Sequence, residues 1–290
     1  MQQSFGFIGL GNMGAPMATN LAAGRGKVAV YDKAGTASRA PQHAECCASV
    51  AEVAAHTNII FLSLPTVASV EEVTQEIIAA KPHADTVVVD TSTTGPELAK
   101  TLHQELSSHA IDYIDAPISG QAFRAREGSL TFMVAASAQR FAMLRPALET
   151  MGTNIFHVGT EPGHGQLMKL VNNYLSISSF VTSSEALACG VHNGLNMEAM
   201  LDVVNASTGQ NFTTTHVFPR NILSGTYDMN AAADILTKDL GMYVERARSS
   251  GASTTLADAS LEVIREFVAA CPHSDQSEIY KFVLAKCAQP

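Results

Sequence analysis

Short apolar runs alternate with longer amphipathic stretches through the first half of the chain, and this alternation constrains the fold most strongly. The runs are rich in β-branched residues and apolar at nearly every position, which indicates strands buried on both faces. Strands that alternate with helices predict βαβ units and a doubly wound, mostly parallel sheet. The predicted strands are Ser4–Gly9, Lys27–Tyr31, Asn58–Leu64, Thr86–Asp90, Tyr113–Ala116, Leu130–Ala135 and Ile155–Val158. The predicted helices are Asn12 to about Ala23, Ser69–Ala80, Pro96–Ser108 and Ala138–Thr150.

The pattern changes at Glu161–Gly165, whose glycine and proline content is typical of a boundary. No strand is predicted beyond this segment. A long helical pattern runs from Gln166 to about His192. Further helices are predicted at Asn196–Ala206, Ala231–Ser249, Thr255–Ala270 and Gln276–Ala288. Because 290 residues exceed the roughly 100–200 of one domain, we expect an α/β domain over 1–162 and a helical domain over 163–290 that begins with the long helix.

A glycine-rich motif follows the first predicted strand and opens the first predicted helix. Its residues are Gly9, Leu10, Gly11, Asn12, Met13 and Gly14, which form a G-x-G-x-x-G pattern. The first glycine permits a tight turn, the second lets the backbone approach a pyrophosphate, and the third allows close packing of helix on sheet. A pyrophosphate is favoured at the helix start, where N–H groups are free. The motif therefore predicts a dinucleotide-binding site.

Asp32 directly follows the second predicted strand, at about the spacing of the acid that binds an adenine ribose. Its carboxylate accepts hydrogen bonds from ribose hydroxyls and repels a 2′-phosphate, so the sequence favours NAD over NADP. The neighbouring Lys33 weakens that preference, and NADP stays an alternative.

Composition excludes several classes of function. The net charge is −9 and no block of Lys or Arg occurs, which argues against nucleic acid or an anionic membrane as partner. No apolar run approaches the roughly 20 residues that span a bilayer. The five cysteines include no CxxC and the ten histidines include no HExxH, so no metal site is predicted. We expect reduced thiols in a cytoplasmic protein, complete and without a signal peptide.

Lys169 is the only Lys or Arg between Arg145 and Arg220, and it lies in an apolar part of the long helix. Asn173 lies one turn further along the same helix face. A partly desolvated lysine has a lowered pKa and can exchange protons near neutral pH. Residue spacing alone does not distinguish such a lysine from one whose stem covers apolar surface while its ammonium reaches water.

Four blocks distinguish these alternatives, because together they make the chain resemble the β-hydroxyacid dehydrogenase family, related to 3-hydroxyisobutyrate dehydrogenase. The blocks are Phe7-Ile-Gly-Leu-Gly-Asn-Met-Gly-Ala-Pro-Met-Ala-Thr-Asn-Leu21, Asp115-Ala-Pro-Ile-Ser-Gly120, Gly163-His-Gly-Gln-Leu-Met-Lys-Leu-Val-Asn-Asn173 and Lys238-Asp-Leu-Gly241. The resemblance implies a Rossmann-type doubly wound domain, an all-α C-terminal domain, a long interdomain helix and an active site between the domains.

The resemblance also implies a role for individual residues. Lys169 is the expected proton donor and acceptor, Asn173 the expected substrate contact, and Ser119 with the backbone of Gly120 the expected carboxylate site. The positions expected along the cofactor are Leu64, Pro65 and Thr93, together with Lys238, which reaches the cofactor or its substrate. A lysine near neutrality can take the hydroxyl proton during oxidation and return it during reduction.

The chain departs from the family after Gly120, where Gln121 replaces a glycine and Phe123 and Arg124 bring bulk and charge. One hypothesis is that Gln121 or Arg124 contacts a second polar or anionic group of the substrate, because arginine suits bidentate anion binding. The alternative is that Arg124 points to solvent or pairs with Glu127. A further candidate for the pocket, Asn211-Phe212-Thr213, is predicted to lie in a loop.

The sequence therefore predicts an NAD(P)-dependent oxidoreductase that transfers a hydride between nicotinamide and a 3-hydroxy acid or semialdehyde. One alternative is a semialdehyde reductase for a substrate with a second anionic group, of the sulfolactaldehyde, succinic semialdehyde or tartronate semialdehyde type. Another is a catalytically silent NAD-binding protein. The expected partner is a small-molecule carboxylate. A homodimer or homotetramer is also expected, because the helical half is apolar and alanine-rich.

Overall fold

The computed structural model of the chain describes residues 3–287. It divides into two compact units, the first ending at Lys169 and the second beginning at Leu170. Strands and helices alternate in the first unit and helices alone make up the elements of the second, so the predicted fold class is confirmed. Within the described residues, no helix is both long and apolar enough to cross a bilayer.

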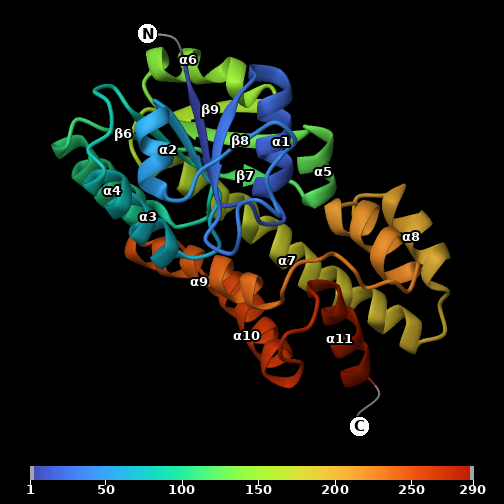
Figure 1. Cartoon of the computed structure of the whole chain (residues 1–290). Helices are drawn as coiled ribbons and strands as arrows, with labels where there is room; N and C mark the ends of the chain where they lie inside the picture. The colour runs from blue at the N-terminus through green and yellow to red at the C-terminus, as the bar shows by residue number, and fades with distance from the viewer. Residues whose placement is uncertain (1–2, 288–290) are drawn as a thin grey trace. The chain divides into compact units, whose positions relative to one another are not determined.

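One nine-stranded sheet forms the centre of the first unit (Figure 1). Its order is β3-β2-β1-β4-β5-β6-β8-β7, and β9 pairs with β8. The strands from β1 to β6 are parallel, whereas β8 runs antiparallel to β6 and β7. The strand order reverses at β1, between β2 and β4, which is where doubly wound folds bind ligands. The strands are β1 Phe5–Ile8, β2 Val28–Tyr31, β3 Glu45–Cys46, β4 Ile59–Leu62, β5 Val87–Asp90, β6 Asp112–Asp115, β7 Ile118–Ser119, β8 Leu130–Ala135 and β9 Gly152–Gly159.

Both faces of this sheet are covered by helices (Figure 1). Successive residues of a strand point to opposite faces, so Phe7 and Phe61 pack in one buried cluster with α1, α5 and α6. Ile8 and Ile60 pack in a second cluster with α2, α3 and α4. The helices are α1 Gly14–Arg25, α2 Val50–His56, α3 Val67–Ala79, α4 Pro96–Ser108, α5 Ala122–Glu127 and α6 Ala138–Leu148. Burial on both faces explains why the central strands β1, β2 and β4 are apolar at nearly every position.

The second unit is helical around its own core, which includes Phe218, Leu240 and Phe267. The long helix α7 His164–His192 begins in the first unit and continues into the second. The other elements are α8 Met197–Asn205, the π-helix η1 Thr213–Leu223, α9 Asp234–Ser249, α10 Thr255–Ala270, the 3-10 helix η2 Gln276–Glu278 and α11 Ile279–Cys287. No strand is assigned after β9 within residues 3–287, apart from one isolated bridge between Ala232 and Asp275.

Of the predicted loop Asn211-Phe212-Thr213, only Asn211 lies outside a helix, so the prediction is wrong for Phe212 and Thr213, where helical structure begins and continues into η1. Asn211 Oδ1 accepts hydrogen bonds from the N–H groups of Thr213 and Thr214 and so caps the helix start. The threonines and the internal Pro219 hide this helix from sequence reasoning, because both residue types have low helix propensity. The short elements β3, β7, α2 and α5 were also not predicted.

Candidate active site

The glycine motif forms a tight turn between β1 and α1. Gly9 has φ +94°, and a Cβ there would lie 2.3 Å from the carbonyl oxygen of Ser63. A Cβ on Gly14 would lie 1.9 Å from the carbonyl oxygen of Gly9, so both positions require glycine. A Cβ on Gly11 would meet nothing within 4 Å, which leaves that side of the turn accessible to a ligand.

The N-terminus of α1 fits an anionic ligand. No side chain caps it at Met13, and its first turn carries no acidic residue. Leu10 and Met13 lie within this turn, with Asn12 exposed between them. The N–H groups and the dipole of an uncapped helix start attract phosphate, so the turn can hold a pyrophosphate.

Asp32 lies at the end of β2 and is bonded to the same turn. Its Oδ2 accepts a hydrogen bond of 2.6 Å from the N–H of Leu10, and its Oδ1 accepts one of 2.8 Å from the N–H of Ala34. Arg39 Nη1 lies 3.7 Å from Oδ2. The acid predicted to bind a ribose is thus fixed beside the turn predicted to bind the pyrophosphate.

The loops after β4 and β5 lie at the same edge of the sheet, because parallel strands end on one side. Leu64 N–H donates a hydrogen bond of 2.9 Å to Ser92 Oγ, which joins the two loops. Pro65 is exposed and Thr93 is half-buried. The strands therefore bring together the predicted cofactor positions of the first unit: Gly9, Leu10, Gly11, Asn12, Met13, Gly14, Asp32, Leu64, Pro65 and Thr93.

A buried carboxylate supports the loop that carries Thr93. Asp90 accepts hydrogen bonds from the N–H of Ser92 and from the hydroxyl of Tyr113, both at 2.9 Å. Burial raises the pKa of Asp90 to about 6, against the opposing effect of those hydrogen bonds. Sequence reasoning gave Asp90 no role, because a strand-ending aspartate looks like an ordinary turn residue.

The Asp115–Gly120 segment links β6 to β7 and then to α5. Ser119 ends β7 and is half-buried, and Gly120 is exposed with φ +136°. Gln121 caps the start of α5 without a side-chain hydrogen bond. The stem of Arg124 lies against Gly120, because a Cβ on that glycine would be 3.2 Å from Cβ and Cδ of Arg124.

Two residues missed by sequence reasoning hold the start of α7. Asp115 Oδ1 accepts a hydrogen bond of 3.0 Å from the N–H of Gly163, and its Oδ2 accepts one of 2.9 Å from the N–H of Gln166. Gln166 Oε1 accepts from the N–H groups of Thr94 and Gly95, so the helix is also joined to the loop after β5. Lys169 follows one turn later and is half-buried. The helix start that positions Lys169 is thereby fixed to two strands.

In the second unit, α7 and α9 bring three polar residues together. Asn173 Nδ2 donates a hydrogen bond of 2.7 Å to Oδ2 of Asp239, and both side chains are buried. Lys238 Nζ lies 3.2 Å from Asp239 Oδ1. Asp239 was quoted only as part of a motif, and its position between the two predicted site residues appears only when α7 packs on α9.

Comparison with known proteins gives matches over nearly the whole chain. Residues 4–159 match the NAD binding domain of 6-phosphogluconate dehydrogenase, and residues 163–283 match the NAD-binding domain of NADP-dependent 3-hydroxyisobutyrate dehydrogenase. The 2-(hydroxymethyl)glutarate dehydrogenase of Eubacterium barkeri is 37% identical over 84% of this chain and 82% of its own length. The 3-hydroxyisobutyrate dehydrogenase of Pseudomonas aeruginosa is 34% identical over 86% of this chain and 87% of its own.

A solved structure also matches the whole fold. The structure of Mycobacterium tuberculosis 3-hydroxyisobutyrate dehydrogenase with L-serine has a TM-score of 0.86 and 27% sequence identity, and the match covers 98% of this chain and 99% of that one.

Proposed function

Because the chain belongs to the β-hydroxyacid dehydrogenase family of NAD- or NADP-dependent oxidoreductases that act on a CH–OH group, we propose that its substrate is a small 3-hydroxy acid or the matching semialdehyde. When bound, the nicotinamide supplies the hydride acceptor or donor. Lys169 is the general acid and base: its Nζ takes the hydroxyl proton during oxidation and returns it during reduction.

The observation that carries this proposal is the anchoring of α7 just before Lys169. Asp115 and Gln166 fix the first turn of the helix through hydrogen bonds to buried backbone groups. A general acid or base must stay at a defined place to act on one proton, and rigid neighbours supply that definition. The ammonium form also stabilises alkoxide character in the transition state.

Other residues are proposed to bind the substrate and the cofactor. Ser119 Oγ and the N–H of Gly120 are proposed to hold the substrate carboxylate, and the Asn173 amide is proposed to orient the substrate. Lys238 is proposed to bind the cofactor or the substrate, with Asp239 beside it to fix its direction. NAD is the proposed preferred cofactor, because Asp32 presents a carboxylate next to the glycine turn.

Replacing Lys169 tests the proposed chemistry. Lys169→Ala is expected to lower kcat by roughly 10²–10⁴-fold, the usual contribution of a general acid or base, while NAD still binds. The assay uses a panel of 3-hydroxy acids and semialdehydes with NAD and NADP in parallel. Full turnover in the variant would remove Lys169 from the mechanism. A wild-type protein that binds NAD but turns over no substrate would instead favour a silent binding protein.

A second candidate is a substrate with a second anionic group. Arg124 is half-buried, and its stem lies against Gly120, next to the proposed carboxylate site. Its guanidinium lies 6.0 Å from the centroid of the Phe123 ring. The relative from Eubacterium barkeri is named for a glutarate, which is a dicarboxylate.

Arg124→Ala is expected to raise KM for dicarboxylic or sulfonated substrates by roughly tenfold or more, the effect of losing one charged hydrogen bond. KM for singly charged 3-hydroxy acids stays nearly unchanged. Arg126→Ala is the matched control, because Arg126 is exposed on the same short helix. Equal small effects on all substrates would contradict the role of Arg124.

The proposed location is the cytoplasm, and the proposed assembly is a homo-oligomer. The five cysteines are free thiols, which fits a reducing compartment such as the cytoplasm. A homodimer or homotetramer is supported by exposed apolar side chains of the second unit, where Leu175, Val203 and Leu256 are 63%, 66% and 72% exposed. Light scattering on the purified chain measures the number of subunits directly.

A further inference from the structure

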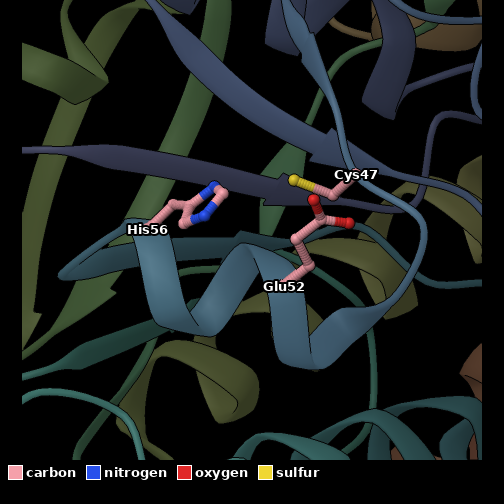
Figure 2. A group of neighbouring side chains, drawn as sticks. All are labelled: Cys47, Glu52 and His56. Atoms are coloured by element: carbon pink, nitrogen blue, oxygen red, sulfur yellow. The ribbon is translucent and has the colours of Figure 1, made fainter.

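A buried thiol, a carboxylate and an imidazole lie close together in the first unit, in a stretch of sequence that contains no predicted active-site residue. They belong to Cys47, Glu52 and His56, and one possible ligand atom from each lies within 4.8 Å of the others. Figure 2 shows the three side chains turned toward one another, with Glu52 and His56 rising from α2 and Cys47 coming from the segment before it.

The backbone holds these residues in place. Cys47 follows β3, and its N–H donates a hydrogen bond of 2.9 Å to the carbonyl oxygen of Val30 in β2. Glu52 and His56 are four residues apart in α2, so they share one face of the helix. Glu52 Oε2 accepts a hydrogen bond of 2.6 Å from the N–H of Ala48, which turns this side chain back toward Cys47.

These three groups are ligands that zinc accepts. Zn²⁺ binds Cys sulfur at about 2.3 Å and His nitrogen or carboxylate oxygen at about 2.0–2.2 Å, so tetrahedral ligand atoms lie about 3–4 Å from one another. The ligand atoms already lie within 4.8 Å of one another, so side-chain rotation alone brings them to that spacing. The mixture of soft sulfur, imidazole and oxygen favours zinc over magnesium or calcium, which prefer oxygen alone.

A fourth residue provides independent support. Glu45 Oε1 lies 3.3 Å from Nδ1 of His56, and Glu45 Oε2 lies 2.8 Å from Nζ of Lys27. An imidazole that donates one N–H to a carboxylate keeps a lone pair on its other nitrogen, and metal-binding histidines usually have such a partner. Glu45 also comes from β3, so it orients His56 from a strand rather than from the same helix.

We propose that Cys47, Glu52 and His56 bind one Zn²⁺ ion, with Glu45 as the partner that orients His56. The ion joins the segment after β3 to both turns of α2 and leaves one coordination position for water. This site is separate from the proposed dehydrogenase function and does not depend on it. The pattern Cys-x4-Glu-x3-His contains neither a paired CxxC nor HExxH, so sequence motifs alone predict no metal here.

Cysteine binds zinc as a thiolate, so metal binding removes the thiol proton of Cys47. Zinc displaces that proton to solvent as the sulfur–zinc bond forms, and no redox partner is required.

Zinc titration of the full-length, chelator-treated and reduced protein tests the proposal, with affinity measured by competition against a chromophoric chelator. The wild type is expected to bind one Zn²⁺ per chain, with a rise in Tm. Cobalt in place of zinc is expected to give a thiolate-to-metal charge-transfer band. Cys47→Ser abolishes that band and weakens zinc binding by roughly 100-fold or more, since even an outer partner of a metal ligand contributes 10–100-fold.

Control variants show whether zinc binds at this cluster rather than at another thiol. Cys46→Ser removes the adjacent exposed thiol and is expected to leave zinc binding unchanged. His56→Gln and Glu52→Gln alter groups on α2, and both are expected to weaken binding even where Cys47→Ser fails to fold. Glu45→Gln is expected to cost roughly 10-fold. The proposal is overturned if the wild type binds no stoichiometric zinc, or if Cys46→Ser weakens binding as much as Cys47→Ser.

Discussion

Asn173 in α7 donates a hydrogen bond of 2.7 Å to Asp239 in α9, although 66 residues separate them in the chain. Asp239 is also the ion-pair partner of Lys238, so one buried carboxylate orders two residues proposed to contact substrate or cofactor. The position of Asn173 therefore depends on α9 as much as on its own helix.

Asp239→Ala should lower the free energy of unfolding by about 1–3 kcal/mol, because it leaves the buried Asn173 amide without its acceptor. Urea denaturation measures the change. Asp239→Asn keeps an acceptor oxygen and should lose less stability, although it removes the charge beside Lys238. Equal losses in the two variants would show that the hydrogen bond to Asn173 is not the stabilising contact.

Gly11→Ala should separate folding from cofactor binding. An added Cβ meets nothing within 4 Å, so we expect the free energy of unfolding to change by no more than about 0.5 kcal/mol. Cofactor affinity should fall, by roughly tenfold where one charged hydrogen bond to the pyrophosphate is lost. Calorimetric titration with NAD measures this affinity.

Gly9→Ala is the contrasting variant, because its Cβ would lie 2.3 Å from the carbonyl oxygen of Ser63 at a φ of +94°. It should unfold at clearly lower urea concentration than the wild type. If Gly11→Ala binds NAD with the affinity of the wild type, the pyrophosphate does not bind at this turn.

Asp32→Asn should shift cofactor preference from NAD toward NADP. The amide keeps an acceptor for the N–H of Leu10 or Ala34 but removes the negative charge that repels a 2′-phosphate. We expect the ratio of kcat/KM for NAD over NADP to fall by roughly tenfold or more. Arg39, 3.7 Å from Asp32, then becomes available to the phosphate, so adding Arg39→Ala should reverse the gain for NADP. An unchanged ratio in Asp32→Asn would argue against a ribose contact.

Asp90→Asn should change how stability depends on pH. The folded pKa of Asp90 is about 6, above the ordinary 3.8, so the folded state binds a proton that the unfolded state releases between these values. Wild-type stability should therefore decrease as pH rises from about 4 to about 6, by about 3 kcal/mol relative to Asp90→Asn, and the difference should stay constant above pH 7. Urea denaturation of both proteins from pH 4 to pH 8 measures this difference, and a flat difference would contradict the burial effect.

Sequence reasoning predicted the longer strands because buried strands leave apolar runs, and most helices because amphipathic stretches have a helical period. Pro96–Ser108 and Thr255–Ala270 were predicted to the residue. Short elements such as β3 and β7 have too few residues for a periodic pattern, and η1 contains residues with low helix propensity.

In the candidate site too, some residues can be predicted from the sequence and others cannot. Gly9 and Asp32 can be predicted because their chemistry depends on local spacing, whereas the role of Lys169 follows only from the resemblance of its motif to the family. Asp239 and Gln166 cannot be predicted, because their roles arise from contacts between elements 66 to 72 residues apart. The cluster of Cys47 with His56 was missed for a different reason: its spacing matches no common metal motif.

Asp115 caps α7 and also opens the segment that leads to Ser119 and Gly120. The end of β6 thus fixes both the helix that carries Lys169 and the start of the segment that carries Ser119 and Gly120. The residues of α5, Ala122–Glu127, take part in none of the hydrogen bonds that fix the helix start. A lineage of such enzymes could therefore exchange one hydroxy acid for another by changes confined to α5, with the proton-transfer geometry inherited intact.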